Sequence, residues 1–244
     1  MARTATLYRM VMPDHVCPFG RRSLDLLQRG GYAVDDRHLT TREQVDAFKA
    51  EHGVKTTPQT FIDGRRIGGH DDLRRFLGKR VRDPRATTYA PVAAIFGMAA
   101  AIAGAAGFSA FGDVFTIRAG EWLVGIAMCL LSLQKLRDID GFANGFLNYD
   151  LLAQRVVRYA WVYPWAEGLA GVLMIAGALL WIAIPVALVI GTIGAVSVVK
   201  AVYVEKRTLK CACVGGNSNV PLGFVSLLEN VLMVAMALWM LARM

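Results

Sequence analysis

Long apolar runs fill the second part of this chain and limit the structures open to it. A helix needs about 20 mostly apolar residues to cross the hydrocarbon core of a bilayer. Five runs approach that length, namely Tyr89–Phe111, about Glu121–Leu136, about Tyr159–Leu180, about Ile182–Val204 and about Leu222–Leu241. Because lipid offers no partners for backbone N–H and C=O groups, a spanning segment of this kind must be helical. Residues 89–244 are therefore predicted to form an all-α membrane helix bundle of about five transmembrane helices.

Basic residues are distributed unevenly between the two ends of these runs. With the N-terminus placed inside, the inner segments hold Arg74, Arg75, Lys79, Arg80, Arg82, Arg85, Lys135, Arg137, Arg155, Arg158, Lys206, Arg207 and Lys210, whereas the outer segments hold Arg118 and Arg243. The positive-inside rule then places the N-terminal residues on the cytoplasmic side of a bacterial-type inner membrane and the C-terminus on the outer side. The formal net charge is +8, but basic residues at the ends of apolar runs favour membrane lipid as partner, and no nucleic acid is expected.

The first 80 residues differ in composition, because charged residues are spread among short apolar stretches. Their pattern predicts the element order βαβαββα. The expected elements are a strand at Ala5–Met12, a helix from Pro18 to the Gly30-Gly31 pair, a strand at Tyr32–Leu39, a helix from Arg42 to about His52, a strand that ends in a turn at Gly64, a return strand at Arg65–Gly68 and a helix ending near Gly78.

Arg9 interrupts the early apolar run Leu7–Met12, so no signal peptide is predicted. The soluble domain, residues 1–80, is therefore expected to stay in the cytoplasm, and a basic linker, residues 81–88, joins it to the membrane domain.

Cys17 is the only cysteine of the soluble domain, and it lies where a loop meets a predicted helix. The helix dipole and the unpaired N–H groups at a helix N-terminus stabilise a thiolate, which makes such a thiol reactive. Cytoplasmic thiols are kept reduced, so we do not expect Cys17 to form a structural disulfide. His15, in the preceding loop, is a candidate for a supporting positive charge. An inert thiol and a solvated histidine are the alternative interpretations.

Three short segments, Cys17-Pro18-Phe19, Thr57-Pro58-Gln59 and Gly68-Gly69-His70-Asp71-Asp72-Leu73, occur in the order and spacing of a glutaredoxin, and the soluble domain resembles that family. The resemblance implies an α/β thioredoxin-like fold and thiol–disulfide oxidoreductase activity, with Cys17 as nucleophile and Pro58 in the cis form. It also implies that glutathione is a substrate, bound by Thr57, Pro58, Gly69, His70, Asp71 and Asp72. Gly20 departs from the pattern, since it stands where dithiol members have a second cysteine. Cys17 therefore has no resolving thiol within its own domain.

Two further cysteines, Cys211 and Cys213, lie one residue apart in the segment Lys210–Pro221 between the last two apolar runs. The charge distribution places this segment on the cytoplasmic face, the same side as Cys17. Lys210 is a candidate for stabilising the two thiolates. Cys129 falls near the middle of the second apolar run and is interpreted by default as a buried, inert residue.

Glu167 and Glu229 lie inside apolar runs, where charged side chains are costly and usually functional or paired. Each falls in the inner half of its run, below the Lys210–Pro221 segment. Gln134, Lys200 and Asn230 fall at comparable levels. We interpret these residues as a polar cluster that lines an inward-facing cavity and moves protons during thiol exchange. A structural polar contact between helices is the alternative.

The second part of the chain carries a resemblance of its own. Its matching residues are Lys135-Leu136-Arg137-Asp138, Tyr149, Tyr163-Pro164-Trp165 with Glu167, Cys211-Ala212-Cys213-Val214-Gly215-Gly216 and Glu229-Asn230. They are similar to the MauE branch of the DoxX-like membrane proteins, which are associated with methylamine utilisation and assist maturation of a disulfide-rich dehydrogenase subunit. The resemblance covers residues from about 120 to 242 and leaves Tyr89–Phe111 as an additional span. It implies a role in redox maturation of a client protein.

Together these observations favour a membrane-bound thiol–disulfide oxidoreductase in which Cys17 exchanges with the Cys211/Cys213 pair. Glutathione and an unknown redox client protein are the expected partners. A soft-metal carrier or transporter is the alternative, because Cu(I) and Hg(II) prefer thiolates and Cys211 with Cys213 offers two. The glutaredoxin domain would then load or unload the metal.

Overall fold

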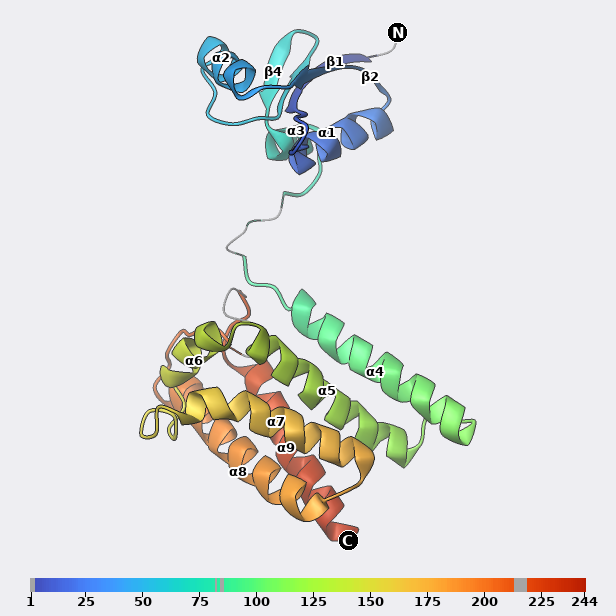
Figure 1. Ribbon diagram of the computed structural model, residues 1–244, viewed down its shortest axis with the longest axis vertical. Coiled ribbons are helices and arrows are strands. Elements are labelled where there is room, and N and C mark those ends of the chain that lie inside the picture. The colour runs from blue at the N-terminus through green and yellow to red at the C-terminus, as the bar shows by residue number, and fades with distance from the viewer. Residues whose placement is uncertain (1–2, 82, 84–85, 213–218) are drawn as a thin grey trace. The chain divides into compact units, whose positions relative to one another are not determined.

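The computed structural model describes residues 3–81, 83, 86–212 and 219–244. The chain divides into two compact units, Met1–Pro84 and Arg85–Met244, and each is described by itself (Figure 1).

The N-terminal unit is a small mixed sheet with three helices. Its elements are β1 (Arg3–Met10), α1 (Pro18–Arg29), β2 (Tyr32–Leu39), α2 (Arg42–His52), β3 (Gln59–Ile62), β4 (Arg65–Gly68) and α3 (His70–Phe76). The strand order is β2-β1-β3-β4. β1 and β2 are parallel and joined through α1, whereas β3 is antiparallel to both β1 and β4. This confirms the predicted α/β fold with the element order βαβαββα.

Alternate residues of β1 face opposite sides of the sheet and so build two cores. Ala5 and Leu7 pack with Leu27 of α1 and Leu73 of α3 on one side. Tyr8 and Met10 pack with residues of α2 on the other side. By the same alternation Arg9 belongs to the side covered by α1, a position normally filled by an apolar residue.

The second unit is helical throughout its described elements. They are α4 (Ala90–Phe111), α5 (Ile117–Arg137), α6 (Ile139–Leu147), α7 (Tyr159–Ala176), α8 (Leu180–Val198), the π-helix η1 (Val199–Val204) that continues α8, and α9 (Phe224–Ala242). Among the described residues, four helical segments are long and apolar enough to cross a membrane, namely α4, α5, α8 with η1, and α9. The predicted third span forms α7, whose 18 residues include Glu167 and several tyrosines and tryptophans that lower its hydropathy. The predicted all-α membrane bundle is confirmed.

Glycines bring α5 and α7 into close contact. A Cβ atom built at Gly171 would lie 2.8 Å from the carbonyl oxygen of Gly125, and one at Gly168 would lie 2.5 Å from Ser132 Oγ. Such close approach of backbones is typical of membrane helices, which gain packing contacts from small residues. α4 lies along α5 at the edge of the bundle, outside the group formed by α5, α7, α8 and α9 (Figure 1).

Candidate functional site

Cys17 is placed by the end of β1 and the start of α1. Its N–H donates to the carbonyl oxygen of Met10 at 3.1 Å, and Met12 and His15 exchange backbone hydrogen bonds of 2.8 and 3.2 Å that close the intervening loop. Cys17 is the N-cap residue of α1, and Pro18 begins the helix. The thiol is buried, whereas the side chain of His15 is exposed. The helix start therefore presents the first unpaired N–H groups close to the Cys17 side chain.

Arg9 occupies the space beside Gly20. A Cβ atom built at Gly20 would lie 2.6 Å from Arg9 Cβ and 3.0 Å from Arg9 Cδ. The Arg9 guanidinium group donates to both carboxylate oxygens of Asp36, from Nε at 2.8 Å and from Nη2 at 2.7 Å. Burial alone would raise the pKa of Asp36, but the hydrogen bonds from Arg9 and His38 outweigh it and lower that pKa. Position 20 is thus closed by a buried, ion-paired arginine, which the sequence analysis did not identify.

The predicted glutathione residues gather at one end of the sheet. The Thr57–Pro58 peptide bond is cis, as the resemblance implied. β3 pairs Gln59 with Tyr8 of β1, so Pro58 adjoins the end of β1 that leads to Cys17. A Cβ atom at Gly69 would lie 3.7 Å from the Pro58 carbonyl oxygen, which places the start of α3 beside the cis bond. Asp72 accepts from the Gly69 N–H at 3.1 Å, and Asp71 is exposed.

His70 links α3 to α1 rather than facing solvent. A hydrogen bond of 3.1 Å joins its Nδ1 to Ser23 Oγ, and both residues are buried. Phe19 lies in the first turn of α1, two residues after Cys17, and the centre of its ring is 6.1 Å from the centre of the His70 ring. Burial, and then the charge of Arg22, lower the pKa of His70, so the imidazole is held neutral. Contact of His70 with glutathione stays a prediction.

In the membrane unit, Cys211 lies in a short pair of extended segments between η1 and α9. Its N–H donates to the Val220 carbonyl oxygen at 2.8 Å, and the Leu222 N–H donates to that of Leu209 at 2.8 Å. The Cys211 sulfur is 3.1 Å from Ser226 Oγ in the first turn of α9, and both residues are buried. Ser226 was missed by the sequence analysis, although it precedes Glu229 by three residues and so shares its helix face.

Glu167 of α7 and Glu229 of α9 meet at Lys135 of α5. The Lys135 Nζ donates to Glu167 Oε2 at 2.6 Å and to Glu229 Oε1 at 2.5 Å, and no part of Lys135 is exposed. Nζ also lies 5.2 Å from the centre of the Tyr163 ring. We call Lys135, Glu167 and Glu229 the buried ion cluster. A cavity of about 80 Å³, lined mainly by apolar residues of α4, α5 and α9, borders Glu229.

The cation of this cluster differs from the expected one. Lys200 pairs instead with Glu205, at 3.7 Å near the surface, and Asn230 donates to the Ser226 carbonyl oxygen at 2.7 Å. Lys135 was assigned from the sequence to the cytoplasmic surface. It lies in the last turn of α5, but two carboxylates converge there, and a buried carboxylate without a cation is strongly destabilising. Its side chain therefore turns inward.

The remaining predicted residues lie in separate places. Lys210 Nζ donates to Asn219 Oδ1 at 2.9 Å. Cys129 packs between α5 and α7, where its thiol lies 3.8 Å from the Gly168 carbonyl oxygen. Cys213 lies outside the described residues, so the exchange of Cys17 with the Cys211/Cys213 pair and the alternative metal site stay predictions. In the described part of the chain, no group of three or more His, Cys, Asp or Glu residues forms a candidate metal site.

Comparison with known proteins finds similarities for each of the two units. A probable glutaredoxin of Synechocystis sp. is 38% identical over 74 residues, which cover 28% of this chain and 80% of that protein. An uncharacterised monothiol glutaredoxin of Caenorhabditis elegans is 32% identical over 72 residues, which cover 27% of this chain and 48% of that protein. A hybrid peroxiredoxin of Haemophilus influenzae is 34% identical over 61 residues, but these cover only 25% of each chain.

The helical unit matches a different family. Residues 113–243 match the family described as methylamine utilisation protein MauE. The match begins after α4, in agreement with the position of α4 at the edge of the bundle. The chain therefore belongs to the MauE family of membrane proteins and carries a glutaredoxin-like domain ahead of the family's helices.

Proposed function

We propose that this protein is a membrane-bound thiol–disulfide oxidoreductase in which Cys17 exchanges disulfides with Cys211 and Cys213. The glutaredoxin relatives and the MauE helices already indicate a membrane-associated thiol redox role. The structure around Gly20 is the observation that supports exchange between Cys17 and the Cys211/Cys213 pair. Gly20 carries no thiol and Arg9 fills the space beside it, so a mixed disulfide formed at Cys17 must be resolved by a thiol from elsewhere. Cys129 is held between two helices, which leaves the Cys211–Cys213 segment as the source within this chain.

The exchange is balanced without any further redox group. The Cys17 thiolate attacks Cys213 of a Cys211–Cys213 disulfide, a Cys17–Cys213 bond forms, and Cys211 leaves as a thiolate. A glutathione thiolate then attacks the Cys17 sulfur, forms glutathionylated Cys17 and releases Cys213 as a thiolate. A second glutathione regenerates Cys17 and departs as oxidised glutathione. Two glutathiones are thereby oxidised for each disulfide reduced, and every step is reversible.

Ser226 and the buried ion cluster would support the leaving thiolate. The Ser226 hydroxyl lies 3.1 Å from the Cys211 sulfur and can donate a hydrogen bond to it when it is charged. Glu229 follows Ser226 by one helical turn and contacts Lys135. This places a lysine and two carboxylates, which can exchange protons, one turn below the sulfur.

Glutathione, the client and the orientation belong to the same proposal. Glutathione would bind beside Cys17 at Thr57, Pro58 and the Gly69–Asp72 segment. The soluble unit and the Cys211 segment would both face the cytoplasm of a bacterial-type inner membrane, with redox maturation of a client protein as the purpose.

Trapping the mixed disulfide tests the proposal. The full chain with Cys211→Ser is incubated with oxidised glutathione, which glutathionylates Cys17 and lets the Cys213 thiolate displace glutathione. A Cys17–Cys213 crosslink should accumulate, because the resolving thiol is missing, and peptide mass spectrometry should identify it. Cys129→Ser is the matched control and should leave the crosslink unchanged, whereas Cys17→Ser should abolish it. If neither Cys211→Ser nor Cys213→Ser ever yields a crosslink to Cys17, the exchange does not occur.

A further inference from the structure

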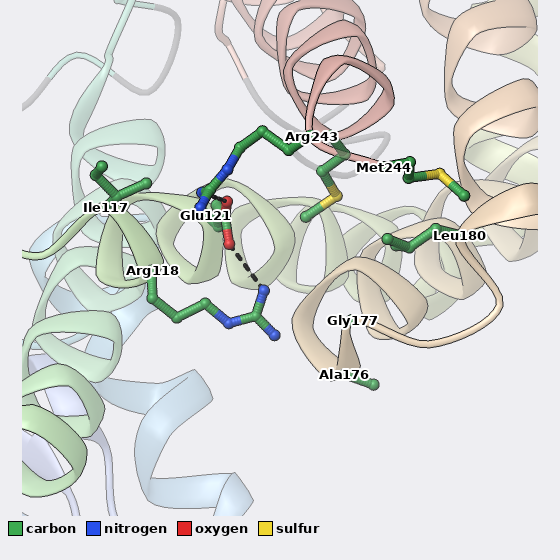
Figure 2. A pocket seen from close by; sticks show the side chains of 9 residues that line it. Ile117, Arg118, Glu121, Ala176, Gly177, Leu180, Arg243 and Met244 are labelled. Carbon is green, nitrogen blue, oxygen red and sulfur yellow. Dashed lines mark hydrogen bonds and ion pairs between the residues drawn. The ribbon is translucent and has the colours of Figure 1, made fainter.

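A second group of charged residues lies at the end of the bundle opposite the buried ion cluster. Glu121 is in the first turns of α5 and Lys135 is in the last, about 21 Å further along the helix axis. Glu121 is only 6% exposed. It accepts hydrogen bonds from Arg118 Nη1 at 2.8 Å, Arg243 Nη1 at 3.0 Å and Trp239 Nε1 at 3.1 Å. Figure 2 shows the two arginines reaching Glu121 from opposite sides.

Arg118 and Arg243 differ in their hydrogen bonds and in their exposure to solvent. Arg118 Nη2 also donates to the Ile175 carbonyl oxygen at 3.1 Å, and a Cβ atom at Gly177 would lie 2.8 Å from that nitrogen. Arg118 is thus enclosed by its surroundings. The side chain of Arg243 is 53% exposed. Its guanidinium carbon lies 5.5 Å from the centre of the Trp239 ring, and among the hydrogen bonds of the described residues only its Nη1 donates. Among these three side chains, two guanidinium groups against one carboxylate leave one positive charge in excess, and Arg243 is the more exposed of the two cations.

A cavity adjoins this excess charge. Its volume is about 490 Å³, and its lining combines Arg118, Glu121 and Arg243 with the apolar side chains of Ile117, Leu180 and Met240. Figure 2 shows Leu180 and Met244 on the side of the cavity away from Arg118. The volume falls within the range of ligand sites, about 300–1,000 Å³. A cationic fork beside an apolar wall matches an anion that carries an apolar chain.

We propose that this cavity binds a phosphate group attached to an apolar chain, and that the remaining N–H donors of Arg243 form hydrogen bonds to the phosphate. A guanidinium fork matches two phosphate oxygens. Glu121 accepts from three donors, two of them cationic, so it does not repel the ligand as a bare carboxylate would. The site lies at the end of the membrane helices, where phosphodiester headgroups are abundant. An anionic phospholipid and free phosphate share this chemistry, and the experiment separates them.

The test measures binding to the full chain purified in a neutral detergent. Native mass spectrometry compares dioleoylphosphatidylglycerol with dioleoylphosphatidylcholine, which has the same chains but no net charge, and sodium phosphate is added as competitor. The anionic lipid should bind about tenfold more tightly, the scale of one charge-assisted hydrogen bond. Arg243→Gln should remove this preference. Arg158→Gln, an exposed arginine outside the cavity, is the matched control and should keep it.

A second variant blocks the cavity without changing charge. Leu180→Trp should fill the apolar part of the cavity and weaken the binding of the anionic lipid by a similar factor. Displacement of the lipid by phosphate alone would show that the headgroup supplies the recognition, and failure to displace it would show that the chain is required. Equal affinity for the two lipids in the wild-type chain, or an undiminished preference in Arg243→Gln, overturns the proposal.

Discussion

Gly20→Ala adds one methyl group to the first turn of α1, and we expect it to destabilise the N-terminal unit. At an open helical position the same change stabilises by up to about 1 kcal/mol, because alanine has the higher helix propensity. At Gly20 the new Cβ would lie 2.6 Å from Arg9 Cβ, an atom fixed directly to the backbone of β1. Overpacking of this kind costs about 1–3 kcal/mol, so a net loss of up to about 2 kcal/mol is expected.

Gly20→Cys tests the same contact with the residue that a dithiol glutaredoxin has there. It adds a sulfur to the Cβ and must also displace the Arg9 methylene groups, which strains the Arg9–Asp36 ion pair. The loss should be at least as large as for alanine. Restoring the dithiol sequence would therefore not restore a well-packed dithiol site.

Labelling of Cys17 provides the assay. In a chain with the other three cysteines changed to serine, the alkylation of buried Cys17 in increasing urea reports the opening of the N-terminal unit. Arg21→Ala, on the exposed side of the same helical turn, is the control and should shift the midpoint little. In an Arg9→Gly background Gly20→Ala should no longer destabilise. A stabilising Gly20→Ala, or an equal cost in both backgrounds, would refute the reasoning.

Three further predictions concern other parts of the molecule. The pKa of His70 is lowered by burial and then by Arg22, so the N-terminal unit should lose stability as pH falls through about 6.5. The urea midpoint of unfolding should therefore be lower at about pH 5.5 than at about pH 7.5. His70→Gln should flatten this dependence. Ser226→Ala should slow alkylation of Cys211 in the reduced protein by about tenfold, because the thiolate loses a hydrogen bond; an unchanged rate would contradict the role given to Ser226. Lys135→Met should destabilise the bundle by about 3–5 kcal/mol in thermal melts, whereas Lys200→Met at the surface should not. Neutralising Glu167 and Glu229 together with Lys135 should recover most of the lost stability.

The fold was predictable because its local signals are strong. Alternating apolar residues mark β1, proline after Cys17 marks the start of α1, and Thr41 caps α2 by accepting from the Gln44 N–H. The apolar length of the later segments predicted the membrane helices for the same reason. These signals act over a few residues and depend little on the rest of the chain.

The residues that complete each candidate site were not predictable in this way. Arg9 was interpreted from the sequence only as an interruption of an apolar run, since nothing nearby indicates that it would lie beneath α1 and pair with Asp36, 27 residues later. Lys135 resembles a surface anchor because Arg137 follows it at the end of α5. Its burial depends on carboxylates from two distant helices, and only the packing of α5 against α7 and α9 brings those together.

This packing also determines which basic residues are exposed at each end of the bundle. Lys135 is buried in an ion pair and no longer counts as a surface charge, while Arg118 and Arg243 at the other end are both bound to Glu121. The basic residues of the helical unit that remain exposed and are not bound to a buried acid include Arg137, Arg155, Arg158, Lys206 and Arg207. All five lie at the end of the bundle that carries the Cys211 segment. The Cys211 end therefore loses only Lys135 from its exposed charges, and the opposite end keeps the one exposed Arg243, so the proposed cytoplasmic side of Cys211 does not depend on Lys135.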